Sequence, residues 1–405
     1  MLTDALKLVM ANQGAAGLDG RTIASIKGRE QSFVSELVRE MRAGAYQPGA
    51  VKRVYIPKKD GSKRPLGIPA LKDRVIQRAL VLLMEPIYEN IFLDLSYGFR
   101  PQRKARECAW RVGKAAFSQR IVFDADIEKF FDHVDHSKLM GLIKNEIVDP
   151  RIHKMIWGFL KSGFQEPGKP WQASHKGTPQ GGPLSPLLAN IYLHYFLDVK
   201  FQGTYGKNPR VKLFRYADDF VILTTDPHDT NPIERDVRSW LWQAGLRLKD
   251  AKTKWVDMRN HMRSHQSKFD FLGFKFHLRG FKDNPKRFWV ARQPSQASRK
   301  ALHEGIKSRL HVGMSLKEAK RRIQETWIGW GEYAKYSNGN RIIHREMHRV
   351  RELGLWWLGR KFRRQKRAVP WSVLRQWNRS LTGSIEPIQV VPDLSKGDQL
   401  RLARL

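Results

Sequence analysis

The spacing of hydrophobic residues predicts a chain that begins and ends in helices, with strands between them. Leu2, Leu6 and Val9 recur at helical spacing with polar residues between them, which predicts an amphipathic N-terminal helix rather than a signal peptide. A second helix is predicted over residues 73–92. The glycine-proline loop that begins at residue 178 is expected to lead into a third, with Ser185 as N-cap and Pro186 at the first helical position.

Four stretches between these helices have the pattern of strands. Residues 51–69 predict a β-hairpin whose turn lies at Asp60-Gly61 and whose arms are rich in Lys and Arg. Residues 120–134 predict a buried strand that opens into an irregular segment. Residues 212–225 predict a hairpin, and residues 268–278 predict a strand pair or tight turn. The sequence therefore predicts a mixed α+β protein.

From about residue 295 the chain becomes helical, strongly basic and rich in Trp. Residues 341–379 contain 12 Lys or Arg but only two Glu, while Ile343, Met347, Val350 and Trp357 lie near helical spacing. A run of charge is usually a solvated face, but exposed salt bridges would need more acids than this one has. We therefore expect one packed face and one positive face that clamps nucleic acid.

Composition strengthens the expectation of a polyanionic partner. The 405 residues include 74 Lys or Arg and 39 Asp or Glu, which gives a net charge of +35 and a pI near 10.4. A field of this sign attracts nucleic acid. An acidic membrane surface is the weaker alternative, because no apolar run approaches the ~20 residues that a spanning helix needs. Cys108 is the only cysteine, which excludes an intrachain disulfide and fits a reducing cytoplasm.

Two adjacent acids, Asp218 and Asp219, stand between apolar flanks in FRYADDFVIL. Buried carboxylates are costly unless they are paired or bind a metal. Asp124 and Asp126 lie two residues apart on a predicted strand and so share one face. One of them together with the pair would form a three-carboxylate cup suited to two Mg²⁺ ions, although Asp-Asp is also common in ordinary turns.

An ordered set of motifs resembles the reverse transcriptases encoded by bacterial group II introns. In that family's order the chain contains NQGAAGLDG, KKDGSKRPLGIP, SYGFRP, FDADIEKFFDHVDH, GTPQGGPLSPLLANIYLHYFLD, RYADDFVI, LKDAKTK and FDFLGF. The stretch from ETWIGWGEYAKY to WWLGRKFRRQKR resembles the family's maturase-specific thumb. The resemblance covers about residues 5–380. It implies a right-hand polymerase with antiparallel fingers and palm followed by an all-α thumb.

The resemblance implies a role for each matching residue. The metal ligands would be Asp126, Asp218 and Asp219 with the Ile127 carbonyl, for two Mg²⁺ ions or for Mn²⁺ in their place. Asp124 would then be a supporting acid. The dNTP-binding residues would be Lys63, Arg64, the aromatic gate Phe131, and the loop Pro179, Gln180 and Gly181.

Further residues match by the same comparison. Lys252 matches a lysine that protonates pyrophosphate, although it could also be an ordinary surface lysine. Phe271, Leu272 and Gly273 match a primer-grip turn, although FLGF could equally be core packing. The predicted nucleic-acid-binding residues of the thumb are Arg360, Lys361, Arg363 and Arg364.

Two other features bear on the comparison. Asp132, His133, Asp135 and His136 could suggest zinc, but helix-start chemistry explains the acids and no cysteine assists. The cysteine-pair endonuclease of longer family members does not follow the thumb, so independent cleavage of a DNA strand is not expected. We expect fingers and palm over residues 1–290 with an N-terminal extension of about 1–30, a thumb over 291–385 and a tail over 386–405.

Three functions fit this pattern. The first is an RNA-directed DNA polymerase that uses an RNA template, a DNA primer and dNTPs. The second is a maturase that binds a structured group II intron RNA and assists splicing, which is compatible with the first. The third is a domesticated relative that acts in phage defence or DNA repair.

Overall fold

The computed structural model describes residues 1–57, 63–260, 267–280, 288–365 and 367–388. The chain divides into two compact units. The first contains Met1–Arg103, Ala125–Phe220 and His228–Lys254, and the second contains Lys104–Asp124, Val221–Pro227 and Trp255–Leu405. The predicted domain boundaries stay predictions. Among the described residues, no helix has the length and apolar character needed to cross a membrane.

Most of the regular elements of the first unit are helices. They are α1 (Leu2–Ala11), α2 (Ile23–Ile26), α3 (Glu30–Arg42), α4 (Leu71–Glu89), α6 (Phe130–His133), α7 (His136–Glu146), α8 (Pro150–Lys161), α9 (Ser185–Leu193), a π-helical turn (His194–Asp198), α10 (Val199–Tyr205) and α11 (Thr230–Gln243). The predicted N-terminal helix is confirmed, and its Leu6 and Val9 are buried. Helix α4 confirms the helix predicted over residues 73–92 and is buried along much of its length.

The predicted basic hairpin is present as β1 (Val51–Pro57) and β2 (Lys63–Ile68). The two strands pair antiparallel with Tyr55 opposite Pro65, and β4 (Phe164–Gln165) adds to β1 in parallel. The sheet order is β2-β1-β4. The predicted turn at Asp60-Gly61, together with Lys58 and Lys59, lies outside the described residues.

A four-stranded sheet has the order β5-β6-β3-β7. Its strands are β3 (Ile121–Asp126), β5 (Val211–Tyr216), β6 (Asp219–Thr224) and β7 (Lys254–Asp257). The hairpin predicted over 212–225 is therefore confirmed as β5 and β6. Its apolar residues pack inward, and Phe220 to Leu223 are fully buried.

One predicted helix start is wrong by one residue. Helix α9 has Leu184 as its N-cap, and Leu184 already has helical backbone angles (φ −79°, ψ −31°). Ser185 is therefore inside the helix, and its hydroxyl donates to the Pro179 carbonyl at 2.7 Å instead of capping the helix. The Ser185 hydroxyl, which the sequence pattern assigns to the helix cap, therefore bonds to the preceding loop instead.

The second unit contains α5 (Ala105–Ser118), on which Cys108 is buried as a small apolar residue. It also contains β8 (Lys268–Phe271), β9 (Phe274–Gly280) and β10 (Phe288–Pro294), which form an antiparallel sheet of order β10-β9-β8. Strands β8 and β9 confirm the strand pair predicted over residues 268–278.

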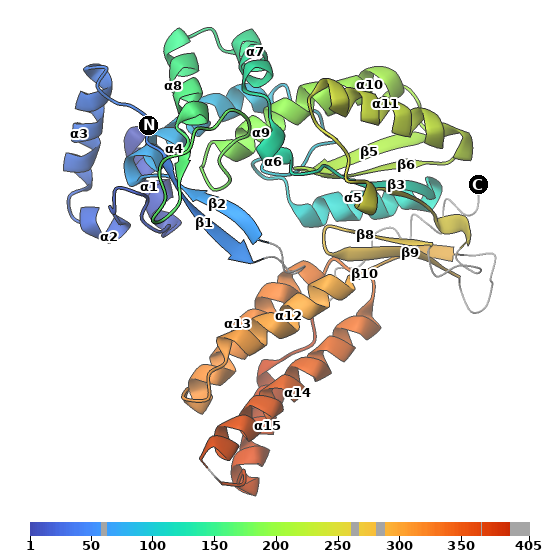
Figure 1. The fold of residues 1–405 in the computed structure, drawn as a ribbon. Coiled ribbons are helices and arrows are strands. Elements are labelled where there is room, and N and C mark those ends of the chain that lie inside the picture. The colour runs from blue at the N-terminus through green and yellow to red at the C-terminus, as the bar shows by residue number, and fades with distance from the viewer. Residues whose placement is uncertain (58–62, 261–266, 281–287, 366, 389–405) are drawn as a thin grey trace. The chain divides into compact units, whose positions relative to one another are not determined.

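Four helices follow in the same unit: α12 (Gln296–Arg309), α13 (Leu316–Ala334), α14 (Asn340–Arg364) and α15 (Trp371–Ser384) (Figure 1). They share one hydrophobic core that includes Trp327, Trp357 and Trp377. Ile343, Met347, Val350 and Trp357 are all buried, so the predicted packed face of this region is confirmed.

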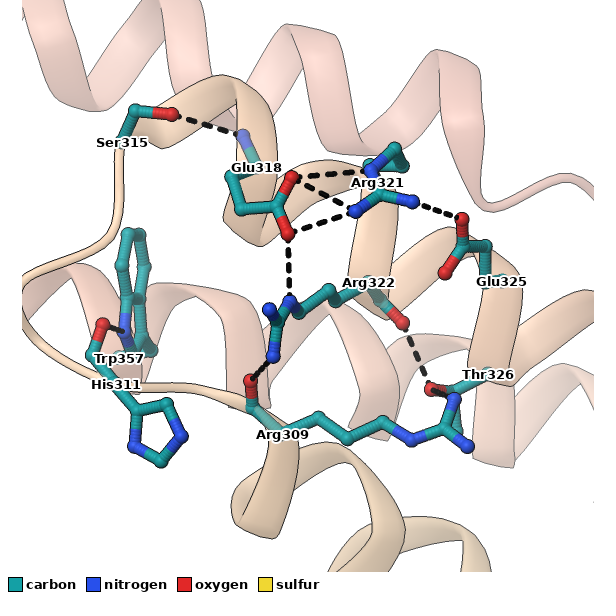
Figure 2. A network of polar contacts seen from close by, with 9 residues as sticks. All are labelled: Arg309, His311, Ser315, Glu318, Arg321, Arg322, Glu325, Thr326 and Trp357. Atoms are coloured by element: carbon teal, nitrogen blue, oxygen red, sulfur yellow. Dashed lines mark hydrogen bonds and ion pairs between the residues drawn. The ribbon is translucent and has the colours of Figure 1, made fainter. Parts of the chain in front are cut away.

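A polar network fixes the connection between α12 and α13 (Figure 2). The Ser315 hydroxyl caps α13 by accepting from the Glu318 amide at 3.1 Å. Hydrogen bonds from Arg321 and Arg322 lower the pKa of Glu318 to about 2. The Trp357 indole donates to the His311 carbonyl at 3.2 Å, which ties the connection to α14.

Candidate active site

The turn between β5 and β6 carries the two adjacent acids. Ala217 and Asp218 connect the strands, and Ala217 adopts φ +59°, a left-handed conformation that is uncommon outside glycine. Asp218 and Asp219 are both half-buried, whereas Phe220 beside them is fully buried. The packed flanks therefore hold the acids at the edge of the core.

Asp126 is the last residue of β3, and a second segment fixes its position. Its carbonyl accepts from the Lys249 amide at 2.8 Å, while Ile127 forms an antiparallel bridge with Leu248. The Lys252 ammonium lies 2.7 Å from Asp126 Oδ2. The Lys252 side chain is 58% exposed, so it lies at the surface and pairs there with a predicted metal ligand.

The acids share an electrostatic environment. Burial raises the pKa of Asp218, and the negative charge of Asp126 raises it further, while Arg64 and Arg215 act in the opposite direction. Asp126 and Arg64, which are far from Asp218 in the sequence, therefore lie close enough to act on its carboxyl. Mutual repulsion of two carboxylates is the condition that a bound cation relieves.

The donor chemistry of this region suits a hard divalent cation, because Mg²⁺ prefers carboxylate and carbonyl oxygens. Within the described ranges, no three His, Cys, Asp or Glu side chains are already gathered as a metal site. Asp132, His133, Asp135 and His136 are among these described residues, and they do not form such a metal site either. Asp135 instead caps α7 by accepting from the Lys138 amide at 3.0 Å, as helix-start chemistry predicts.

The predicted dNTP-binding loop lies against strand β2. The Gly67 amide donates to the Gln180 carbonyl at 2.6 Å. Gly181 has φ +117°, and a Cβ there would lie 2.4 Å from the Gly67 carbonyl oxygen. Only glycine fits this approach of two backbones. The structure therefore brings the loop to the strand that begins with Lys63 and Arg64.

The predicted gate Phe131 lies in the same neighbourhood. A cavity of about 290 Å³ is lined by Phe131, Pro179, Gln180 and Gly67, together with Arg53. The Arg53 guanidinium lies 3.1 Å from the centre of the Phe164 ring. Phe131 and the glycine-proline loop thus form two walls of one hollow.

Sequence reasoning missed a buried polar network behind the acidic turn. Arg215 is fully buried and forms a two-pronged ion pair with Asp198, in which Nε to Oδ1 is 2.7 Å. Its remaining nitrogen donates to Asn190 Oδ1 at 3.1 Å and to the Ala217 carbonyl at 3.0 Å. Arg215 therefore holds the strained residue next to Asp218.

Further contacts complete this network. The Asn190 amide donates to the Gly98 carbonyl at 2.7 Å, and a Cβ on Gly98 would lie 2.3 Å from the Ala217 nitrogen. Asp198 ends the π-helical turn that follows α9. An arginine three residues before Asp218 was a visible signal in the sequence. The π-helical turn that brings Asp198 to it was not.

The predicted primer-grip residues form the β8–β9 turn in the second unit. Leu272 has φ +47° and Gly273 has φ +72°, while Phe271 is buried. The Tyr333 hydroxyl donates to the Leu272 carbonyl, and the Gly273 carbonyl accepts from the Ser295 amide at 2.8 Å. The turn is rigidly held, with its phenylalanine packed inside.

The predicted basic cluster at the end of α14 divides into two kinds of side chain. Arg363 and Arg364 are exposed, as is Arg360, whose guanidinium lies 4.9 Å from the centre of the Trp356 ring. The Lys361 ammonium instead donates to the carbonyls of Val312 at 3.1 Å and Met314 at 2.7 Å. Lys361 fastens the loop after α12, whereas the arginines face outward.

Comparison with known proteins identifies the family. Residues 56–276, more than half of the chain, match the family "Reverse transcriptase (RNA-dependent DNA polymerase)". Protein YkfC of Escherichia coli is 36% identical over 290 residues, which cover 62% of this chain and 76% of YkfC. The group II intron-encoded protein LtrA of Lactococcus lactis is 41% identical over 187 residues, which cover 45% of this chain and 31% of LtrA.

Among solved structures, the telomerase of Candida albicans in complex with a fragment of telomeric RNA has a TM-score of 0.48 at 12% identity. The match covers 95% of this chain and 69% of that chain, but a score this low supports no functional conclusion. The family match confirms the expected α+β, right-hand polymerase class. Reverse transcriptases generally use divalent metal ions and act on nucleic acids. The chain belongs to the reverse transcriptase (RNA-dependent DNA polymerase) family and is related to the proteins that group II introns encode.

Proposed function

We propose that the chain extends a DNA primer on an RNA template, with Asp126, Asp218 and Asp219 as its catalytic acids. The observation that supports this most directly is the shared environment of Asp126 and Asp218 inside the matched family region. The primer 3′-hydroxyl attacks the α-phosphorus of a dNTP, a phosphodiester bond forms, and pyrophosphate leaves.

The three carboxylates and the Ile127 carbonyl would hold two Mg²⁺ ions. When bound, the ions lower the pKa of the attacking hydroxyl and stabilise the leaving pyrophosphate. Arg64 and Lys63, at the start of β2, bind the triphosphate. Lys252, 2.7 Å from Asp126, protonates the pyrophosphate as it leaves.

Primer extension on an RNA template with Mg²⁺ and dNTPs tests this proposal. Asp218→Ala and Asp219→Ala should each reduce extension at least about 10³-fold, because metal and electrostatic stabilisation supply most of the rate. Asp94→Asn is the matched control, since the Asp94 side chain is 84% exposed and paired with Arg103 in a surface ion pair. Normal extension by either alanine variant would reject the catalytic assignment.

Phe131 would exclude ribonucleotides, because a ring beneath the incoming sugar collides with a 2′-hydroxyl. Its support is the cavity that Phe131 forms with Pro179 and Gln180. Phe131→Ala should raise ribonucleotide incorporation relative to dNTP incorporation by about tenfold or more, whereas Phe131→Tyr should keep the barrier. Unchanged selectivity in Phe131→Ala would reject the gate.

We also infer a role in binding intron RNA, which the similarity to an intron-encoded protein favours. A maturase should bind one structured group II intron RNA far better than a scrambled RNA at about 0.5 M salt, where non-specific phosphate contacts are weakened. Equal binding of both RNAs would favour the alternative of a domesticated enzyme in phage defence or DNA repair.

A further inference from the structure

A buried histidine at the start of α7 joins two parts of the candidate active site. His136 is 3% exposed, and its Nε2 atom lies 2.6 Å from the Gly177 carbonyl oxygen. A carbonyl oxygen only accepts, so Nε2 carries the hydrogen and donates it. Gly177 is 41 residues further along the chain and lies two residues before Pro179 of the predicted dNTP-binding loop. The ring nitrogen that could suggest a zinc ligand is therefore committed to this backbone carbonyl.

The surroundings of the imidazole hold it in one orientation. The Asp135 side chain caps α7 and so fixes the backbone at His136. The Trp157 ring of α8 packs against the imidazole, with 6.2 Å between the ring centres and 76° between the ring planes. Burial lowers the pKa of His136, so the ring is neutral at neutral pH. Within the described residues, its Nδ1 is buried without a hydrogen-bond partner, so the bond to Gly177 orients the ring.

Two backbone hydrogen bonds run beside this histidine. The Gly177 amide donates to the Val134 carbonyl at 2.8 Å. The Thr178 amide donates to the Phe131 carbonyl, also at 2.8 Å. Gly177 has φ +86°, and a Cβ there would lie 2.7 Å from the Phe131 carbonyl oxygen, so glycine is required for this approach. With the bond from His136, three hydrogen bonds fasten the segment that carries Phe131 to the start of the loop.

The loop has a second attachment, to strand β2. The Gln180 carbonyl accepts from the Gly67 amide at 2.6 Å. The hollow of about 290 Å³ is lined by Phe131 as well as by Pro179 and Gln180, so its width depends on both attachments. The attachment to β2 sets where the loop stands relative to the sheet. The attachment at His136 sets how far the loop stands from Phe131.

We propose that His136 is a positioning residue that sets the distance between Phe131 and the loop, and through it the discrimination between deoxyribonucleotides and ribonucleotides. The inference rests on the proposed function, in which Phe131 excludes a 2′-hydroxyl. Exclusion by a ring depends on where the other wall lies, because a wider hollow lets the sugar move away from the ring. A misplacement of about 1 Å in such a site can cost about 10²-fold. His136 acts through the Gly177 carbonyl, without touching the substrate.

Three variants separate the hydrogen bond from the bulk of the ring. His136→Phe keeps a ring but removes the donor, whereas His136→Gln returns an N–H donor at a similar reach. His153→Phe is the matched control, because His153 Nε2 lies 2.6 Å from the Ile147 carbonyl in the same unit. Single-nucleotide incorporation on an RNA template gives kcat and KM for a dNTP and for the matching ribonucleotide.

His136→Phe should lower the ratio of the two kcat/KM values, dNTP over ribonucleotide, by about tenfold. The change should lie in KM, with kcat for the dNTP within about twofold, because the catalytic acids are unchanged. His136→Gln should restore most of the ratio, and His153→Phe should leave it unchanged. A merely structural loss would reduce the active fraction for both nucleotides and leave their ratio alone. In a Phe131→Ala background, His136→Phe should cause no further fall, because the gate through which it acts is absent.

Amide hydrogen exchange measures the positioning without catalysis. Peptides that cover residues 174–182 should exchange at least about tenfold faster in His136→Phe than in the unaltered protein or in His153→Phe, because the loop loses an attachment. The melting temperature of each variant checks its folding. If His136→Phe does not fold, Gly177→Ala takes its place, since its Cβ pushes the loop away from the Phe131 carbonyl, and the same fall in the ratio is expected.

An unchanged ratio in His136→Phe would overturn the proposal, as would a fall of equal size in His153→Phe or in His136→Gln. Normal extension with an unchanged ratio leaves the polymerase assignment in place and rejects only the role of His136. If the unaltered protein extends no primer, the proposed function fails and the selectivity role fails with it. Faster exchange confined to His136→Phe would then still show that His136 holds the loop.

Discussion

The acidic turn of the first unit and the basic face of α14 in the second, which includes the exposed Arg345 and Arg349, use charge in opposite ways. At the turn, each of the two acids occupies a single fixed position. The buried Arg215 donates to the Ala217 carbonyl and so holds the backbone beside Asp218. On α14 several cations are exposed, and the buried acid Glu346 pairs with Arg299 and His303. Chemistry at one phosphorus atom needs fixed groups, whereas holding a long polyanion needs only enough positive charge in the right place.

The largest expected difference between the two regions is in catalysis. Asp218→Asn keeps the size of the side chain but removes its charge, so primer extension should fall at least about 10³-fold. Removing one exposed cation of α14 by Arg345→Ala should reduce primer extension only about threefold near 0.15 M salt, since one phosphate contact among several is lost. Steady-state kinetics at matched enzyme concentrations checks both. Losses of similar size would remove the distinction between the regions.

The second difference concerns stability. Arg215→Met leaves Asp198 charged and buried without its partner, so the free energy of unfolding should fall by about 3 to 5 kcal/mol. Arg321→Met breaks an ion pair with Glu318 in which the arginine is 59% exposed, and should cost less than about 1 kcal/mol. Denaturant unfolding measures both values. A small loss at Arg215 would show that the network does not hold the turn.

A third comparison separates two neighbouring cations at the end of α14. Lys361→Met removes the bonds to the Val312 and Met314 carbonyls and should lower stability by about 1 to 2 kcal/mol, with little change in the salt dependence of binding. Arg364→Ala should do the reverse and make the salt slope shallower by about 0.7 to 0.9. Unfolding and binding curves on the same preparations decide whether the two roles are separate.

The smallest effect is expected from the pH dependence of stability. Burial raises the pKa of Asp218 in the folded protein, so its ionised form opposes folding above the ordinary carboxyl pKa of about 4. Asp218→Asn should therefore raise the melting temperature at neutral pH by roughly 1 to 3 °C in buffer containing a chelator. The gain should vanish below about pH 4, where the carboxyl is protonated in both states. A gain independent of pH would point to another cause.

Sequence reasoning was most successful where the signal was local. The paired strands at 51–69, the acidic turn at 212–225 and the packed face of α14 follow from periodicity and turn chemistry, and the structure confirms them. The predicted start of α9 was wrong by one residue, because the Ser185 hydroxyl donates to the Pro179 carbonyl in the preceding loop. A helix-cap pattern in the sequence does not show that another acceptor competes for the same hydroxyl.

Non-local partners could not be predicted from the sequence. Lys252 and Asp126 are 126 residues apart, and nothing in either motif indicates the ion pair between them. The match of Asp198 to Arg215 depends on a π-helical turn, and no periodic pattern specifies that turn. The carbonyl bonds of Lys361 and the exposure of Arg364 likewise could not be predicted from a run of basic residues, since they depend on which carbonyls lie within reach.

The burial of Arg215 with Asp198 also limits which substitutions this chain can accept during evolution. Replacing either residue alone leaves a full charge in a place that solvent does not reach, because both side chains are 0% exposed. An apolar pair could fill the same space, but each single step toward it passes through an unstable intermediate. Substitutions at the two positions are therefore expected to appear together among related sequences. The exposed arginines of α14 are expected to be substituted independently of one another.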